Sequence, residues 1–112
     1  MGITTHVLDT SKGKPGAGIS ITLEFMTGGN WKEIGGGSTN SDGRLPTLLP
    51  EGHKLEAGTY RIQFETKKYF DAQNLKCFYP NVPVIFEIED TTQHYHVPLL
   101  ISPFGFSTYR GS

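Results

Sequence analysis

Short segments of alternating apolar and polar residues, separated by turn residues, run through most of this chain. The clearest is residues 19–25, where isoleucine, leucine and phenylalanine at the odd positions alternate with serine, threonine and glutamate at the even ones. Because successive side chains of a β-strand point to opposite faces, this pattern predicts a half-buried strand. Comparable patterns occupy residues 3–9, 58–65, 82–89 and 94–101. Such a series of short strands predicts an all-β protein, either a sandwich or a barrel.

Three further segments bring the expected number to about eight strands. Trp31 begins a strand that the glycines at 35–37 interrupt, which suggests a bulge or a close approach of another backbone. After a strong turn signal at 40–43, residues 44–49 can form a short strand limited by prolines. Residues 104–109 form the last strand.

One short helix is expected in the middle of the chain. Thr66 can cap its N-terminus, and the helix would continue to about Asn74 with Tyr69 and Phe70 on its inner side. No linker divides the chain, so we expect a single domain over residues 1–112. With 112 residues and 36% hydrophobic content its core would be modest. Oligomerisation would supply further burial.

Charge and cysteine content exclude several classes of protein. The net charge of −1 argues against a nucleic-acid-binding surface. Cys77 is the only cysteine, so no intrachain disulfide can form and a disulfide-stapled secreted scaffold is excluded. The longest apolar run, residues 97–101, is far shorter than the roughly 20 residues of a membrane span, and no signal peptide is visible. We therefore expect a cytoplasmic protein without nucleic-acid or membrane partners, with the periplasm and the peroxisome as open alternatives.

Two of the predicted strands carry histidines on a face that is neither core-like nor fully polar. On residues 94–101 the odd positions resemble a core face, whereas the even positions hold two histidines, a proline and a leucine. On residues 3–9, His6 and Leu8 share the face opposite to the core-like one. A sheet face that mixes imidazoles with aliphatic side chains suggests a surface covered by another subunit. Scattered surface histidines are the alternative that the pattern leaves open.

Spacing gives less support to other chemistries. His94 and His96 project to the same side and could form a zinc site with His6, but no fourth ligand is evident. The Gly-x-Ser-x-Gly elbow of many serine hydrolases is absent, and Cys77 lacks the local signature of a nucleophile. The glycines at 35–37 are not followed by the Gly-Lys-Ser/Thr of a phosphate loop. We expect neither a metal nor another cofactor.

Four segments make the chain similar to a known family. They are Thr-His-Val-Leu-Asp at 5–9, Asp-Gly-Arg at 42–44, His-Tyr-His-Val-Pro-Leu-Leu-Ile-Ser-Pro at 94–103 and Tyr-Arg-Gly-Ser at 109–112. The chain closely resembles the 5-hydroxyisourate hydrolase family, the transthyretin-related enzymes of purine catabolism, whose hallmark is the terminal tetrapeptide. The resemblance covers essentially the whole chain.

The resemblance implies a fold and an assembly. The fold would be the transthyretin-like β-sandwich of two four-stranded antiparallel sheets, with a short helix after the fifth strand. The assembly would be a homotetramer, a dimer of dimers with a channel between the dimers. His6, Leu8, His96, Pro98 and Leu100 would line that channel, so the resemblance supplies the covering subunit that the mixed face suggests.

The resemblance also implies an enzyme that binds a small-molecule substrate. It would open the ring of 5-hydroxyisourate by hydrolysis, giving 2-oxo-4-hydroxy-4-carboxy-5-ureidoimidazoline in urate degradation. The catalytic residues would be His6, Arg44, His96 and Ser112, and the residues that bind substrate would be Leu8, Pro98, Tyr109, Arg110 and Gly111.

Each of these residues has a chemical role under that interpretation. An imidazole with a pKa near 6.5 can activate water and move protons near neutral pH, although the sequence does not fix whether His6 or His96 is the base. Arg44 would hold the carbonyl-rich substrate and its developing oxyanion. Tyr109 would form a wall of the pocket, and Arg110 would rather anchor the C-terminal tail.

Two other functions remain open at this point. A non-catalytic, transthyretin-like carrier would bind aromatic ligands in the channel without turnover. A structural or partner-binding β-sandwich would have no channel site. The two histidines, the arginine and the terminal tetrapeptide favour the enzyme, because residues at the site separate functions that a shared fold does not.

Overall fold

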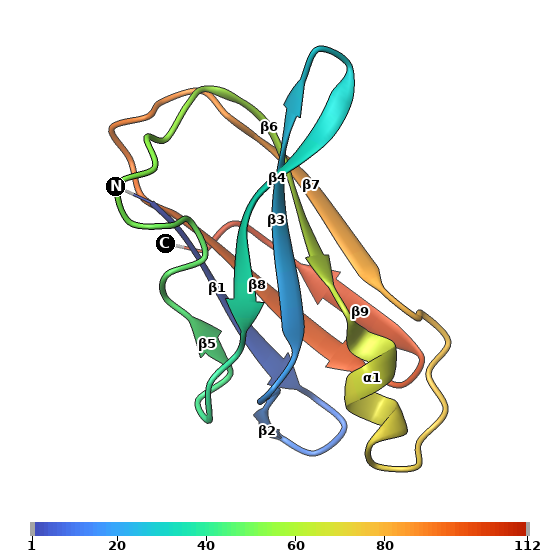
Figure 1. Cartoon of the computed structure of the whole chain (residues 1–112). Coiled ribbons are helices and arrows are strands. Elements are labelled where there is room, and N and C mark those ends of the chain that lie inside the picture. The colour runs from blue at the N-terminus through green and yellow to red at the C-terminus, as the bar shows by residue number, and fades with distance from the viewer. Residues whose placement is uncertain (1, 112) are drawn as a thin grey trace.

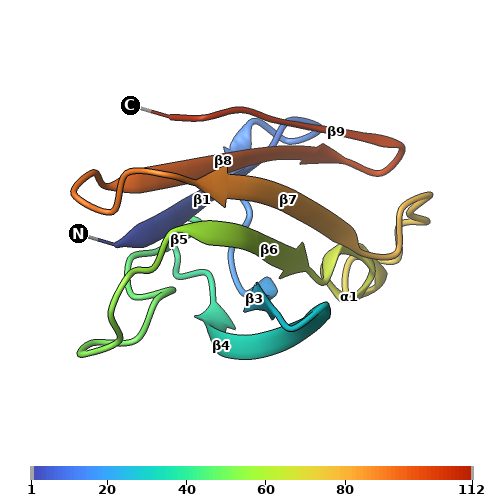
Figure 2. The same cartoon turned by 90° about the horizontal axis from the view of Figure 1, so that it is seen from above.

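Two β-sheets pack face to face in the computed structural model, which describes residues 2–111 (Figure 1). Seen from above, the sheets form two layers, with the helix α1 at one end and both ends of the chain at the other (Figure 2). The predicted all-β architecture is confirmed, and of its two variants the structure is the sandwich.

The first sheet joins strands from the two ends of the chain. Its order is β2 (Lys14–Pro15), β1 (Ile3–Asp9), β8 (Tyr95–Ser102) and β9 (Gly105–Thr108), and β5 (Arg44–Leu45) also pairs with β1. β1 and β8 run parallel, with Thr4 opposite His96 and His6 opposite Pro98. The sheet has five strands where the resemblance implied four, because the two-residue strands β2 and β5 are both part of it.

The second sheet is antiparallel and contains a β-bulge. Its order is β4 (Asn30–Ser38), β3 (Ser20–Thr27), β6 (Gly58–Phe64) and β7 (Val82–Ile88). The register slips between Leu23 and Glu24, which lie opposite Gly35 and Glu33, so Ile34 is the extra residue. A side chain at Gly35 would collide with the backbone at residue 48. The glycines at 35–37 therefore mark both a bulge and a close backbone approach, but they lie within β4 instead of ending it.

Inward-facing side chains of both sheets form the core. The alternation predicted for residues 3–9, 19–25 and 58–65 is observed as alternating burial along these strands. The largest fully buried side chains are Tyr60, Phe64, Phe70, Ile3, Ile19, Leu23, Leu48, Ile62, Ile88, Leu99, Ile101 and Val7. In the first sheet the core side chains stand at the odd positions of β1 and β8, so the even positions of these strands form its outer face.

Helix α1 (Thr66–Asp71) follows β6 and buries Phe70 in the core. The prediction that Thr66 caps it is wrong: Thr66 is buried inside the first turn, and its hydroxyl donates to the Tyr79 carbonyl oxygen at 2.7 Å. The helix is also shorter than predicted, because the chain turns after Asp71 and Asn74 has a φ of 58°, which no right-handed helix accommodates. No helix in the described part of the chain is long and apolar enough to cross a membrane.

Candidate active site

One outer face of the first sheet collects most of the predicted site residues. The parallel register of β1 and β8 places Thr4, His6 and Leu8 beside His96, Pro98 and Leu100. The pairing of β8 with β9, and the bridge from His96 to Gly111, put Tyr109 and Gly111 on the same face. We call this surface the histidine face; it consists of Thr4, His6, Leu8, Arg44, His96, Pro98, Leu100, Tyr109 and Gly111.

The histidine face is mixed, as the alternation of residues 3–9 and 94–101 predicts. His6 and His96 are half-buried, Leu8 is 36% exposed and Leu100 is half-buried. A protomer therefore presents imidazoles and aliphatic groups to solvent on one flat surface.

A tight turn brings Arg44 to this face. Asn40 Oδ1 accepts the Arg44 N–H at 3.0 Å, and the Gly43 carbonyl oxygen accepts the Val7 N–H of β1 at 2.7 Å. Gly43 has a φ of 75° and lies so close to the Val7 carbonyl that a side chain would not fit. The Asp-Gly-Arg segment thus attaches β5 to β1 with Arg44 directly opposite His6.

His96 is held by contacts on both sides of its ring. Its Nδ1 lies 2.8 Å from Thr4 Oγ1, and the same oxygen lies 2.9 Å from His94 Nε2. Burial lowers the pKa of His96, and positive charge on Arg44, His6 and His94 lowers it further. At neutral pH the ring is therefore uncharged, and one of its two nitrogens carries a lone pair in place of a hydrogen. Thr4 was not among the predicted residues, although it shares the outer side of β1 with His6.

The C-terminal tail packs on the other side of His96. The Gly111 N–H donates to the His96 carbonyl oxygen at 2.8 Å. A Cβ at Gly111 would lie 2.7 Å from His96 Cδ2 and 3.3 Å from Pro98 Cγ, so only glycine lets the tail approach the imidazole this closely. Pro98 is buried beneath it. Ser112, the fourth predicted catalytic residue, lies outside the described residues.

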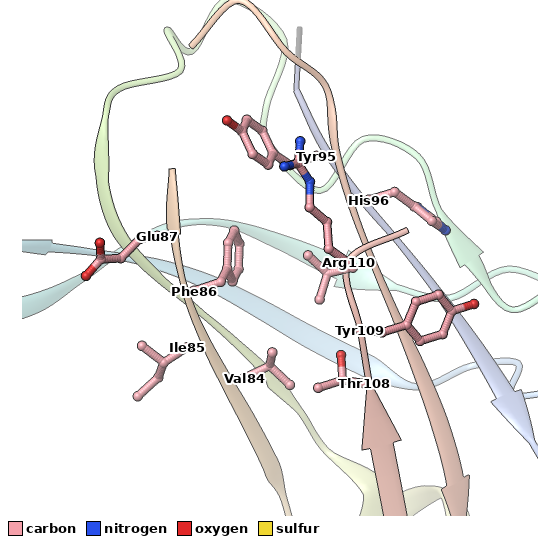
Figure 3. A pocket seen from close by; sticks show the side chains of 10 residues that line it. Val84, Ile85, Phe86, Glu87, Tyr95, His96, Thr108, Tyr109 and Arg110 are labelled. Atoms are coloured by element: carbon pink, nitrogen blue, oxygen red, sulfur yellow. The ribbon is translucent and has the colours of Figure 1, made fainter. Parts of the chain in front are cut away.

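Arg110 points away from the histidine face. Its guanidinium carbon lies 4.7 Å from the centre of the Tyr95 ring, and its Nη2 donates to Gln93 Oε1 at 2.6 Å. Figure 3 shows this side chain extending along Tyr95, whereas His96 and Tyr109 extend to the other side of β8. Of the two roles considered for Arg110, these contacts fit the anchoring of the tail.

A cleft of about 320 Å³ lies next to the histidine face, between β7 and the β8–β9 hairpin. Apolar side chains such as Val84, Ile85 and Phe86 form much of its lining, together with His96 and Tyr109 (Figure 3). His6, Leu8 and Arg44 are not part of this lining. The polar groups of the histidine face therefore lie mostly beside the cleft, open at the surface of the protomer.

The groups on the histidine face suit hydrolysis of a carbonyl compound. Within residues 2–111, no three histidine, cysteine, aspartate or glutamate side chains are placed to hold a metal ion. The face instead combines a neutral imidazole, a second imidazole and a planar cationic donor. These groups can take a proton from water, pass a proton on and stabilise an oxyanion.

Comparisons with known proteins agree on the fold. A family model described as HIUase/Transthyretin family matches residues 3–111. A Salmonella dublin protein named 5-hydroxyisourate hydrolase is 44% identical over 110 residues, which cover 98% of this chain and 80% of that protein. The structure of Klebsiella pneumoniae 5-hydroxyisourate hydrolase is similar with a TM-score of 0.85 at 33% identity and covers 98% of each chain. Sea bream transthyretin in complex with thyroxine is similar with a TM-score of 0.91 at 31% identity, covering 97% of this chain and 93% of that one.

The two structural neighbours share one architecture under two different names, one a hydrolase and one a protein bound to thyroxine. Overall similarity of the backbone therefore cannot choose between hydrolysis and ligand carriage. The distinction between hydrolysis and ligand carriage has to come from the side chains of the histidine face.

Proposed function

The chain belongs to the HIUase/Transthyretin family, and from this premise we propose that it hydrolyses 5-hydroxyisourate with His6, Arg44 and His96 as the reacting groups. The observation that carries the proposal is the convergence of these three side chains, from β1, β5 and β8, on one sheet face. The relative at 44% identity and the structural neighbour at 33% identity are both named as this hydrolase, which supports catalysis over carriage.

His96 is the base of the proposed reaction. Ring opening begins when water attacks a ring carbonyl carbon, and a base must take a proton from that water. Burial and the neighbouring charges lower the pKa of His96, so the ring is neutral and ready to accept the proton at neutral pH. His6, on the neighbouring strand β1, passes this proton on to the ring nitrogen that leaves when the carbon–nitrogen bond breaks, so both imidazoles return to their starting state.

Arg44 stabilises the charge that develops on the attacked carbonyl oxygen. Its guanidinium is exposed on the same face, opposite His6, where a flat heterocycle can reach it. Removal of one donor of this kind raises a reaction barrier by about 2.7–4 kcal/mol. Leu8, Pro98 and Tyr109 would form the walls of the site, Gly111 and Arg110 would hold the tail, and Ser112 would complete the hydrogen bonding.

The active assembly in this proposal is a homotetramer in which the histidine face is covered by another subunit. A lone protomer leaves Leu8 and the groups around Arg44 open to solvent, whereas hydrolysis is favoured in a site that excludes bulk water. A second copy over this face would convert the flat surface into a channel with two sets of reacting groups.

The decisive experiment generates 5-hydroxyisourate in place from urate and follows its ultraviolet absorbance with and without the protein, with a chelator in both samples. We expect acceleration over spontaneous decay. His6→Ala, Arg44→Ala and His96→Ala should each keep a wild-type circular dichroism spectrum and lose about 10²–10⁴-fold in kcat.

His53→Ala is the matched control, because His53 is an exposed loop histidine and is not among the charged neighbours of His96. It should keep the full rate. Near-wild-type rates in all three site variants would show that the site is elsewhere, and a folded wild-type protein without any acceleration would favour the carrier.

A further inference from the structure

The hydroxyl of Thr4 lies between two imidazoles on the histidine face. Thr4 Oγ1 is 2.8 Å from His96 Nδ1 and 2.9 Å from His94 Nε2, both ordinary hydrogen-bond lengths. The parallel pairing of β1 with β8 fixes Thr4 directly opposite His96. The backbone next to His94 is also held in place by Tyr95. The Tyr95 N–H donates to the Gly2 carbonyl oxygen at 2.9 Å, and the Tyr95 hydroxyl donates to the Asp90 carbonyl oxygen at 2.7 Å.

The number of hydrogens on this oxygen limits the possible arrangements. A threonine hydroxyl has one hydrogen and two lone pairs, so it can donate to only one of the two rings. If both rings donated to it, its own hydrogen would have only solvent as acceptor, because Thr4 Oγ1 has no other hydrogen bond among the described residues. The two arrangements that use this hydrogen between the rings are therefore the ones to compare. Either His96 Nδ1–H donates to Thr4 and Thr4 donates to His94 Nε2, or both bonds run in the opposite direction. Only the first arrangement leaves the Nε2 lone pair of a neutral His96 free.

We propose that His94 is a positioning residue which, through the Thr4 hydroxyl, holds neutral His96 in the tautomer with hydrogen on Nδ1 and a free lone pair on Nε2. This inference rests on the proposed role of His96 as the base. His94 Nε2 is the acceptor at the end of this chain of hydrogen bonds, so neutral His94 carries its hydrogen on Nδ1. We name the chain from His96 through Thr4 to His94 the Thr4 relay.

The Thr4 relay suits a base that gains and loses a proton in each turnover. When Nε2 of His96 takes a proton from water, Nδ1–H still donates to Thr4 and Thr4 still donates to His94. No hydrogen bond has to break or reverse during the step, and the two linked bonds strengthen each other. The other charged groups that face His96, His6 from β1 and Arg44 from β5, make no hydrogen bond to its ring among the described residues.

A double-mutant cycle tests whether Thr4 and His94 act as one unit. Thr4→Val removes the hydroxyl and keeps the branched shape, and His94→Ala removes the final acceptor. We expect each to lower kcat by about 10–100-fold, part of the ~10²–10⁴-fold that general base catalysis contributes, with KM changed less than about 2-fold. Because both changes break the same chain of bonds, the double variant should be no slower than the slower single variant. Thr4→Ser, which restores a hydroxyl, should recover most of the rate.

Matched controls separate the relay from general effects of these substitutions. Thr22→Val makes the same change on β3, in the other sheet, and His53→Ala removes a histidine from a loop. Both should keep the wild-type kcat.

A direct readout of the tautomer does not depend on activity. In ¹⁵N spectra of histidine-labelled protein at pH 8, Nδ1 of His96 should have the shift of a protonated ring nitrogen and Nε2 that of an unprotonated one. Thr4→Val should move both shifts toward the averaged values of a free imidazole. A His96 that carries its hydrogen on Nε2 in the wild type, or a double variant whose loss is the product of the single losses, would overturn the proposal.

The two proposals fail in distinguishable ways. If the wild-type protein does not accelerate decay of 5-hydroxyisourate, the proposed function fails and the ¹⁵N shifts alone decide on the relay. If the wild type is active and Thr4→Val keeps full kcat, the relay fails and the function stands.

Discussion

Four separate parts of the chain set the chemical surroundings of His96. His6 comes from β1, Arg44 from β5, His94 from the segment before β8, and Gly111 from the tail after β9. The first and last of these are more than a hundred residues apart in the printed sequence, yet both lie around one ring. We therefore expect a substitution at any of these positions to change the reactivity of His96.

The glycine of the tail gives a test at this scale. Gly111→Ala would place a methyl group 2.7 Å from His96 Cδ2, so the tail would have to move away from the ring. We expect kcat/KM to fall about 10-fold or more, since a displacement near 1 Å can cost 10²-fold, while the thermal midpoint changes little because the tail lies at the edge of the fold. Kinetics and a melting curve on the same sample would check this.

Gly105→Ala is the matched control on the same hairpin. A Cβ there would lie 3.7 Å from Ser102 Oγ, an ordinary contact, so the variant should retain its activity. Equal rates for the two variants would contradict a role of the tail in positioning His96.

Part of the histidine face is predictable from the sequence, but Thr4 is not. The period of two placed His6 with Leu8, and His96 with Pro98 and Leu100, and the structure confirms that all five share a face. Arg44 and the tail came only from the family resemblance, because an arginine after a turn has no distinctive pattern. Thr4 was missed because a strand threonine is ordinary, and its significance depends on the register between β1 and β8.

At the scale of elements, a buried carboxylate fastens helix α1 to the end of β1. Asp9 is fully buried, and it accepts hydrogen bonds from the Ser11 N–H at 3.0 Å, the Ser11 hydroxyl at 2.5 Å and the Tyr69 hydroxyl at 2.7 Å. Burial raises the pKa of Tyr69 to about 12, and the bond to Asp9 adds to the effect. Burial by itself would raise the pKa of Asp9, but these hydrogen bonds outweigh it and lower the pKa.

Loss of this connection should weaken the fold measurably. Tyr69→Phe removes the hydroxyl and keeps the ring, so we expect the free energy of unfolding to fall by about 1.5–3 kcal/mol, the range for a hydrogen bond to a charged group. Urea denaturation at pH 7 would measure it. Tyr79→Phe, on a ring that is 39% exposed, serves as the control and should have an effect below about 0.5 kcal/mol.

The loss of unfolding free energy in Tyr69→Phe should depend on pH with a definite sign. Since the folded-state pKa of Asp9 is lowered, its stabilisation is present above the ordinary carboxyl value near 3.9 and is lost as the pH falls through the lower, folded-state pKa. A Tyr69→Phe effect that grew on acidification would contradict the role of the carboxylate.

Element boundaries show where local patterns stop being informative. The long alternating strands were predicted well, because burial on one face imposes a period of two over seven or eight residues. The strand predicted at 44–49 is only Arg44–Leu45, since Pro46 has no N–H for the ladder. β2 and β5 have two residues each, too few for any period, although β5 is what brings Arg44 to His6.

At the scale of the whole molecule, the proposed tetramer depends on the aliphatic part of the histidine face. Leu8→Asp puts a charge where a second subunit would cover the strand, so we expect the assembly to separate into smaller species.

Leu75→Asp is the matched control, because Leu75 is 37% exposed against 36% for Leu8 but lies beyond α1, away from this face. Sedimentation velocity at micromolar concentration should show a mass near four times 12.4 kDa for the wild type and the control only. Identical masses for both variants would place the interface elsewhere.

The general architecture was accessible from the sequence, but the pairing between distant strands was not. Alternation with frequent turns predicts a sandwich without saying which strands become neighbours. The parallel pairing of β1 with β8 joins residues at opposite ends of the chain, and nothing in either strand alone encodes it. The family resemblance supplied what local patterns could not.

That same parallel pairing sets the order in which the protein becomes functional during its synthesis. Thr4 and His96 are 92 positions apart, so at about 5–20 residues per second the ribosome completes β1 roughly 5–20 seconds before its partner strand exists. During that interval His6 has neither His96 nor the tail beside it, and the nascent chain has no reacting pair. Appearance of enzymatic turnover in a translation reaction would therefore report the moment at which β8 pairs with β1 and the tail reaches His96.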